Sequence, residues 1–263
     1  MIFIIMGIIS IMVLSLLPAL IYSFIIYITI PYKTINIKNG MVYLVGGFMS
    51  VILLLYFFYL FPGWNNIASV ITNHKIYPLH FLHAKTFIQV GLIEELVKLI
   101  TFIIIEKLLN NDKRKYHPLS TMFNVAMISL GFAVVENVSY AMKAFDPLDV
   151  ILWRSVTAVI GHMVFGLFMG YWIALGRVGT RLKNRSLFDI VVLKSDKLRR
   201  RIFILIGLLS AITLHGIYDL HVFINGDRGI STLYMLLIMS LLAASWCFKN
   251  LNKSYKNKLE KFN

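Results

Sequence analysis

Long apolar stretches separated by short polar breaks run along almost the whole chain. A helix needs about 20 mostly apolar residues to cross the hydrocarbon core of a membrane. The stretches that meet this requirement are roughly Ile2–Ile30, Met41–Phe61, Thr86–Leu109, Leu119–Ala141, Val150–Gly176, Ile202–Phe223 and Ile230–Phe248. The pattern therefore predicts an all-α, polytopic membrane helix bundle of about seven transmembrane helices, with residues 1–263 forming a single integral membrane domain.

The breaks between these stretches hold residues typical of turns, such as Pro62-Gly63 and Asp146-Pro147. The first stretch has no basic region before its apolar run, and that run is too long for the core of a signal peptide. We therefore expect a span there and not a cleaved leader. The loop Gly63–Lys85, which is rich in histidine and aromatic residues, is expected to lie at the membrane interface; a substrate gate or a surface metal site is the alternative.

The basic residues give the orientation of the predicted spans. Most of the 26 Lys and Arg residues fall on one side, above all in the Arg177–Arg201 loop and after Lys249. The connections on the other side hold only Lys75, Lys85, Lys143 and Arg228. Because cytoplasmic loops carry the excess of Lys and Arg, we expect the amino terminus outside and the carboxyl terminus in the cytoplasm. The Arg177–Arg201 loop is attributed to this orientation and to attraction to anionic lipid.

The composition supports a membrane protein and excludes other classes. The chain is 59% hydrophobic and 14% charged, with a mean hydropathy of +0.77, whereas soluble domains average about 45–50% apolar and about 25% charged residues. The formal net charge of +14 then reports topology, and no nucleic-acid partner is expected. The single cysteine, Cys247, excludes an intrachain disulfide and a cysteine-based zinc site.

Several ionisable or polar side chains lie inside the predicted spans, where a charge at the helix centre costs about 2.5–3.5 kcal/mol. They are Glu94, Glu95 and Lys98 in the third span, Glu136 and Asn137 in the fourth, Arg154 and His162 in the fifth, and His215 and Asp219 in the sixth. The alternating topology and a rise of about 1.5 Å per residue give the depth of Glu94, Glu136, His162 and His215. These four residues should lie roughly 7–18 Å below the outer surface. We expect the four helices to share one site in the outer half of the membrane.

Each of these residues also has a structural interpretation that needs no chemistry. Lys98 is one turn from Glu94 and Glu95, so a local ion pair could lower the cost of burial. Asp219 is one turn after His215 and could only orient that imidazole. Arg154 is near a predicted outer end and could extend to the interface.

The charge of this layer suggests a metal. Its four carboxylates exceed its two cations by two negative charges, which one divalent ion would neutralise. Glu and His suit Zn²⁺, and a catalytic zinc site uses three protein ligands plus water. Zinc lowers the pKa of water to about 7, and a carboxylate can take the proton. Alternatively, a glutamate could activate water without metal while His or Asn stabilises the oxyanion.

Other interpretations of the buried charges are less well supported. The His-Glu-x-x-His, Gly-x-Gly-Asp and Gly-x-Ser-x-Gly motifs of other hydrolases are absent from the sequence. A proton- or ion-coupled transporter could also use buried Glu and His residues, but transporters usually show paired repeats and interrupted helices. An inactive scaffold for a membrane partner is the third possibility.

Four short motifs, in order and each on a separate predicted span, resemble those of a known family. They are an EExxK motif at Glu94–Lys98, a GFAxxENxxY motif at Gly131–Tyr140, His162-Met163-Val164-Phe165-Gly166 followed by Gly170-Tyr171, and His215-Gly216-Ile217-Tyr218-Asp219. Over about 86–223 the chain resembles the PrsW family of bacterial intramembrane proteases, within the wider group of CAAX prenyl proteases and bacteriocin-immunity-type proteins. The prenyl-protease branch differs, because it has Arg after the Glu pair at another spacing and His where this chain has Glu136.

The resemblance implies a multi-pass intramembrane endopeptidase of the bacterial plasma membrane. It would make the site-1 cut, on the extracytoplasmic side, in a single-span membrane-anchored anti-sigma factor, and so activate a sigma factor under envelope or antimicrobial-peptide stress. The family is usually classed as metallopeptidase, which implies a divalent metal such as Zn²⁺.

The expected site combines this resemblance with the depth argument. The catalytic residues are expected to be Glu94, Glu95, Glu136, His162 and His215, of which Glu136, His162 and His215 would bind the metal. Lys98, Asn137, Asp219 and Arg154 are expected to support them. Gly166 and Gly170, which follow His162 at four-residue spacing, are expected to allow close helix packing.

Overall fold

The computed structural model describes residues 2–29, 36–71, 78–109, 117–178, 196–225 and 230–259, and within them it contains helices and turns without a strand. The long helices are α1 (Ile2–Thr29), α2 (Ile37–Leu60), α5 (Ile93–Leu108), α6 (Pro118–Ala141), α8 (Ala158–Val178), α9 (Asp196–Asn225) and α10 (Ile230–Leu259). The shorter elements are η1 (Pro62–Asn66), α3 (Ile67–Ile71), α4 (Pro78–His83), η2 (Ala84–Leu92) and α7 (Pro147–Val156). The predicted all-α bundle is confirmed.

Five helical segments of the described chain are long and apolar enough to cross a membrane. They are Met6–Thr29, Ile37–Leu60, Pro118–Ala141, Pro147–Arg177 and Lys197–Asn225. The predicted third and seventh spans are helical too, but neither is among these five. In the third span, α5 has 16 residues and carries both acidic and basic side chains. The number of seven spans therefore stays a prediction.

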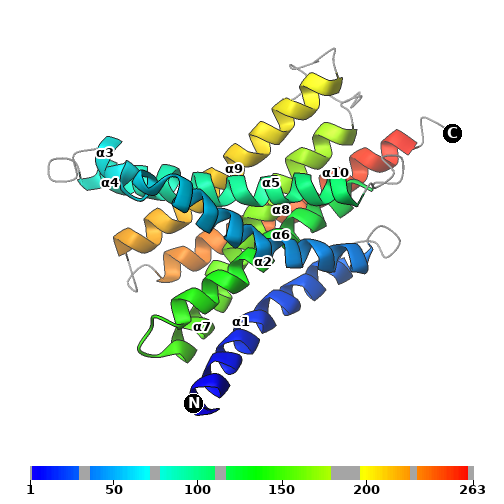
Figure 1. Cartoon of the computed structure of the whole chain (residues 1–263). Coiled ribbons are helices and arrows are strands. Elements are labelled where there is room, and N and C mark those ends of the chain that lie inside the picture. Colours follow the sequence, from blue (N-terminus) through cyan, green and yellow to red (C-terminus); the bar gives the residue numbers. More distant parts are fainter. Residues whose placement is uncertain are drawn as a thin grey trace.

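Helix α6 lies at the centre of the bundle and packs against α1, α2, α5, α7, α8 and α10 (Figure 1). Most of its residues are buried. Gly47 of α2 and Gly131 of α6 meet where these helices cross, because a Cβ on either one would overlap the backbone of the other helix. A Cβ on Gly166 or Gly170 of α8 would likewise press against the α6 backbone. The predicted packing role of these two glycines is confirmed.

Two of the predicted spans are not continuous α-helices. The third begins with η2, which is a π-helix, and becomes α-helical only at Ile93. The fifth is divided between α7 and α8 at Thr157, whose φ of −121° and ψ of −78° are not helical. Short π-helical segments are frequent at functional sites. Both interruptions lie beside predicted site residues, since Glu94 follows η2 and Arg154 precedes Thr157.

The chain after α2 folds back over the start of the third span. The indole nitrogen of Trp64 donates to the backbone oxygen of Gln89 at 3.0 Å, and the Gln89 amide donates to the backbone oxygen of Asn65 at 2.7 Å. These bonds fix η1 against η2. The interfacial position expected for the Gly63–Lys85 loop stays a prediction, and its residues 72–77 lie outside the described residues.

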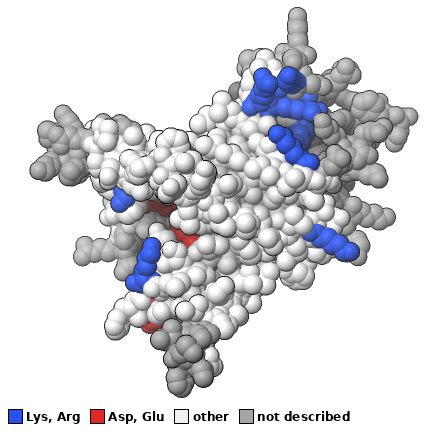
Figure 2. Space-filling view, in the orientation of Figure 1, with Lys and Arg blue, Asp and Glu red and all other residues white. Residues whose placement is uncertain are grey.

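The helix ends gather at two opposite ends of the bundle (Figure 1). One end holds the amino terminus, α3, α4, α7 and the last turns of α6 and α9; the other holds the last turns of α1, α5, α8 and α10. Basic side chains gather at the second end, around the start of α9 (Figure 2). This distribution agrees with the orientation predicted above, which stays a prediction; residues 179–195 of the Arg177–Arg201 loop and Arg228 lie outside the described residues.

Candidate active site

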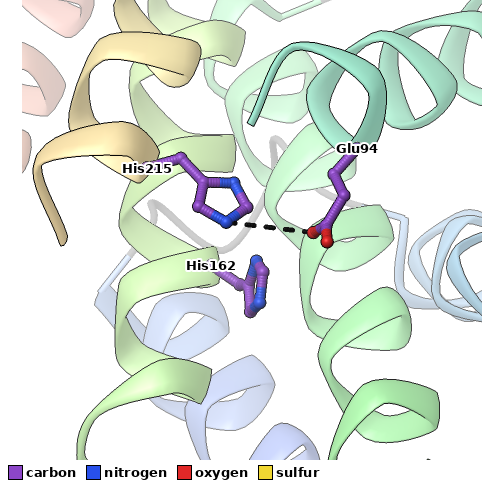
Figure 3. A group of neighbouring side chains, drawn as sticks. All are labelled: Glu94, His162 and His215. Carbon is purple, nitrogen blue, oxygen red and sulfur yellow. Dashed lines mark ion pairs between the residues drawn. The ribbon is translucent and has the colours of Figure 1, made fainter. Parts of the chain in front are cut away.

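Glu94, His162 and His215 come from three helices and meet inside the bundle (Figure 3). Glu94 is in the first turn of α5, His162 is in α8 and His215 is in α9. One ligand atom from each of the three lies within 4.8 Å of the other two. Both histidines are only 3% exposed. The three side chains thus form a buried group able to surround a single ion.

Small residues allow η2 and α9 to approach closely enough to bring Glu94 and His215 together. A Cβ on Gly216 of α9 would overlap the ring of Phe87 in η2. A Cβ on Gly91 of η2 would lie 3.6 Å from a backbone oxygen of α9 and 2.9 Å from one of η2 itself. The close contact places His215, next to Gly216, over the first turn of α5.

Glu95 is fully buried and binds two groups through one oxygen. Its Oε1 lies 2.9 Å from Nδ1 of His215 and 2.7 Å from Nζ of Lys98. With Nδ1–H donated to Glu95, the lone pair of a neutral His215 is on Nε2, which lies 3.9 Å from Oε2 of Glu94. A carboxylate that holds one histidine nitrogen in this way is typical of histidines that bind metals through the other nitrogen.

Glu136 holds His162 in the same manner. Its Oε2 lies 2.7 Å from Nε2 of His162 and 2.8 Å from Nη2 of Arg154. The Nε of Arg154 donates to Oδ1 of Asn137 at 2.8 Å, and the guanidinium lies 4.0 Å from the ring centre of Tyr140. Arg154 is therefore held within the protein by Glu136 and Asn137.

Lys98 and Asp219 make the local pairs that the sequence suggested, but these pairs belong to the same site. Lys98 is fully buried, with Nζ 3.8 Å from Oε2 of Glu94 and 3.1 Å from Nδ1 of His162 on another helix. Oδ2 of Asp219 lies 3.5 Å from Nε2 of His215. Lys98 thus contacts His162, and Asp219 contacts His215.

The structure brings the predicted site residues together, but it groups the candidate metal ligands differently from the prediction. The expected ligand set was Glu136, His162 and His215, whereas the mutually close ligand atoms belong to Glu94, His162 and His215. Glu136 instead bonds the Nε2 of His162. Motif spacing does not reveal which carboxylate faces both histidines, because this depends on the rotation of each helix about its axis.

Two aromatic residues of the site were not singled out from the sequence. Phe165 stacks on the ring of His215, with centroids 5.1 Å apart and planes at 19°. The ammonium of Lys98 lies 4.2 Å from the ring centre of Phe132. Both residues stand inside the motifs quoted above, and this was the one signal in the sequence that could have pointed to them.

The buried carboxylate oxygens and imidazole nitrogens of the site fit a divalent cation. Oε2 of Glu94 and Oε2 of Glu95 have no hydrogen-bond partner among the described residues, although both are buried. A buried carboxylate oxygen without such a partner is costly unless a cation satisfies it. Two imidazoles and one carboxylate are also the protein ligands of one type of catalytic zinc site.

Sequence comparison identifies the family. The model of the PrsW family intramembrane metalloproteases matches residues 40–245. Protease PrsW of Clostridioides difficile (strain 630) is 26% identical over 204 residues, which are 75% of this chain and 72% of the relative. Protease PrsW of Shouchella clausii (strain KSM-K16) is 27% identical over 194 residues, or 71% and 76% of the two chains. No solved structure matches the chain. The family match spans most of the chain and every residue of the site, so the chain belongs to the PrsW family of intramembrane metalloproteases.

Proposed function

We propose that this membrane protease makes the first, extracytoplasmic-side cut in a single-span anti-sigma factor, and that Glu94, His162 and His215 form its metal centre. Membership of the family establishes a peptidase that acts on a membrane protein. The substrate class and the residue roles are our proposal. The observation that carries the metal centre is the convergence of three ligand atoms, from α5, α8 and α9, within 4.8 Å.

These three side chains would hold the divalent cation, and their two nitrogens and one oxygen favour zinc. A bound zinc ion supplies Lewis-acid polarisation of a peptide carbonyl and acidifies water. The chain's own contribution begins with orientation. Glu95 and Glu136 fix the two imidazoles through Nδ1 of His215 and Nε2 of His162, and so direct the remaining nitrogens inward. Both carboxylates are therefore positioning residues in this proposal.

Asp219 is the carboxylate best placed to take a proton from water. Its Oδ2 is 3.5 Å from the nitrogen of His215 that faces Glu94. Its side chain is 20% exposed, whereas the side chain of Glu95 is fully buried. Glu136 is similarly exposed but is engaged by Arg154 and His162. We therefore assign proton transfer to Asp219.

The position of the site supports a cut near the outer surface. Glu136 stands near the end of α6, and Asp219 near the end of α9, at the end of the bundle where the amino terminus also lies (Figure 1). Figure 2 shows acidic atoms in an indentation on this side, below the lobe that holds α3 and α4. In the predicted orientation this end faces away from the cytoplasm, which suits a substrate cut on its extracytoplasmic side.

The experiment that tests the function uses purified protein in liposomes with a tagged single-span anti-sigma factor. We expect the wild type to cut it in the outer half of its span or just outside, as mapped by mass spectrometry. Glu94→Gln and Asp219→Asn should both lose cleavage, but only Glu94→Gln should also lose metal. Asp149→Asn, which changes an exposed carboxyl of α7 outside the site, should cut normally. An intact substrate with the wild type, or equal cleavage by all variants, contradicts the proposal.

A further inference from the structure

We propose that the ammonium group of Lys98 competes with a metal ion for Nδ1 of His162 and has to withdraw from this nitrogen when a metal binds. This inference rests on the proposed metal centre. It gives Lys98 a defined task, which is to compensate the buried carboxylates before loading and to limit the affinity for the metal afterwards.

The distances place the ammonium group of Lys98 among the candidate metal ligands. Its Nζ is 3.1 Å from Nδ1 of His162 and 3.8 Å from Oε2 of Glu94, so it contacts two of the three candidate ligands. Nζ also lies 2.7 Å from Oε1 of Glu95, the carboxylate that holds the third ligand, His215. A positive group thus stands beside two of the candidate ligands and beside the carboxylate that holds the third.

His162 cannot bind the ammonium of Lys98 and a metal ion at the same time. Nε2 of His162 faces the carboxylate of Glu136 and carries the proton, which leaves one lone pair on Nδ1. That lone pair faces Nζ of Lys98 at 3.1 Å. It can accept a hydrogen bond from the ammonium or coordinate a metal, but not both. Metal binding through Nδ1 therefore requires that Lys98 gives up this bond.

The carboxylate of Glu95 offers the ammonium of Lys98 an alternative partner within the protein interior. It is already bonded to Oε1 of Glu95, and Oε2 of the same carboxylate has no hydrogen-bond partner among the described residues. A lysine side chain is flexible and carries three donors. The ring of Phe132, 4.2 Å from Nζ, also favours a cation at this position. The ammonium can shift toward Glu95 and remain paired while the ligands close on the metal.

Electrostatics gives the direction of the effect on metal affinity. A unit positive charge a few ångströms from a divalent cation opposes its binding, and burial weakens the screening by water. Without Lys98 the metal-free site would hold its carboxylates with one cation fewer, which destabilises the empty protein. Neutral substitutions should therefore tighten metal binding and lower the stability of the metal-free form together.

The test measures zinc affinity of the purified full-length protein by competition with a chelating dye, and thermal unfolding with and without zinc. We expect Lys98→Met and Lys98→Gln to bind zinc about 10-fold or more tightly than the wild type. Their metal-free forms should melt earlier. Lys98→Arg, which keeps the charge, should not bind more tightly. Lys107→Met, which changes an exposed lysine on the same helix, should match the wild type.

The outcomes separate this inference from the proposed function. If the wild type binds zinc and the neutral variants bind it equally or more weakly, the role of Lys98 is overturned and the metal centre stands. If the wild type binds no zinc, the metal centre fails and the inference fails with it. Lys98→Gln retains a donor toward Glu95, so it provides the answer if Lys98→Met does not fold.

Discussion

Adjacent glutamates at the start of α5 have different surroundings, and we propose different roles for them. Oε2 of Glu94 lies 3.9 Å from Nε2 of His215, whereas Glu95 binds Nδ1 of His215 and Lys98 through Oε1. The structure thus separates two residues that look equivalent in the sequence. Glu94 suits a ligand, and Glu95 suits a residue that positions one.

This difference predicts unequal effects of the same substitution. Glu94→Gln removes a ligand and should abolish stoichiometric zinc binding. Glu95→Gln weakens the support of His215 and should lower the zinc affinity by about 10–100-fold, as is usual for such supporting carboxylates. Zinc competition titrations check this. Equal losses in the two variants, or no loss in Glu95→Gln, would show that the assignment is wrong.

The sequence predicts the participants of the site better than their roles. Span depth places Glu94, His162 and His215 in one layer, and in the structure the three side chains lie together. It does not select the carboxylate that faces the histidines, since each residue turns the helix by about 100°. The π-helix η2 also changes the rotation of Glu94 relative to the preceding residues, and nothing in the sequence announces it.

Among the helices, α6 depends on two features that can be tested separately: its glycine crossing with α2 and its first-turn cap. Gly131→Ala adds a methyl group against the backbone of α2, where a Cβ would overlap Leu44. Overpacking of this kind costs about 1–3 kcal/mol, so the melting temperature should fall. Gly7→Ala is the control, because a Cβ there has nothing within 4 Å. If both variants melt alike, the crossing is looser than described.

The residue that caps α6 makes the stability of the folded protein depend on pH. Nδ1 of His117 accepts the backbone N–H of Leu119 at 3.2 Å, just before the membrane span begins. Burial lowers the pKa of His117 from 6.5 to about 4. Between these pH values the unfolded chain binds a proton that the folded chain does not, so this histidine makes stability fall as the pH drops from 6.5 toward 4.

His117→Asn should reduce that loss of stability. Asparagine caps a helix well and does not titrate. Melting temperatures in detergent at pH 7.5 and pH 5 should therefore differ less in this variant than in the wild type. An equal or larger difference in the variant would assign the pH dependence to other groups.

Across the whole molecule, charge separates into a basic end and an acidic interior site. Apolar runs predict the helices well because the thickness of the bilayer fixes their length, and the basic residues predict which end faces the cytoplasm. In our proposal the interior charges carry the catalysis. The family assignment accordingly favours a protease over the transporter that the same buried Glu and His residues first allowed.

The predicted orientation is testable with cysteine labelling of intact cells. In a Cys247→Ser background, Gly63→Cys should react with an impermeant maleimide, because Gly63 stands at the predicted outer end in open space. Lys253→Cys, at an exposed position near the other end, should react only after permeabilisation. The reverse labelling pattern would invert the topology and place the site near the cytoplasm.

The central claim is that Glu94, His162 and His215 hold a metal that the protease needs, and elemental analysis of active, purified protein tests it most directly. We predict about one zinc or other divalent transition-metal ion per chain. That ion should be absent from Glu94→Gln, His162→Ala and His215→Ala and retained in Asp149→Asn, and chelation should stop cleavage. Active wild-type protein without a stoichiometric metal, whose cleavage survives chelation, would contradict the account and favour a glutamate mechanism without metal.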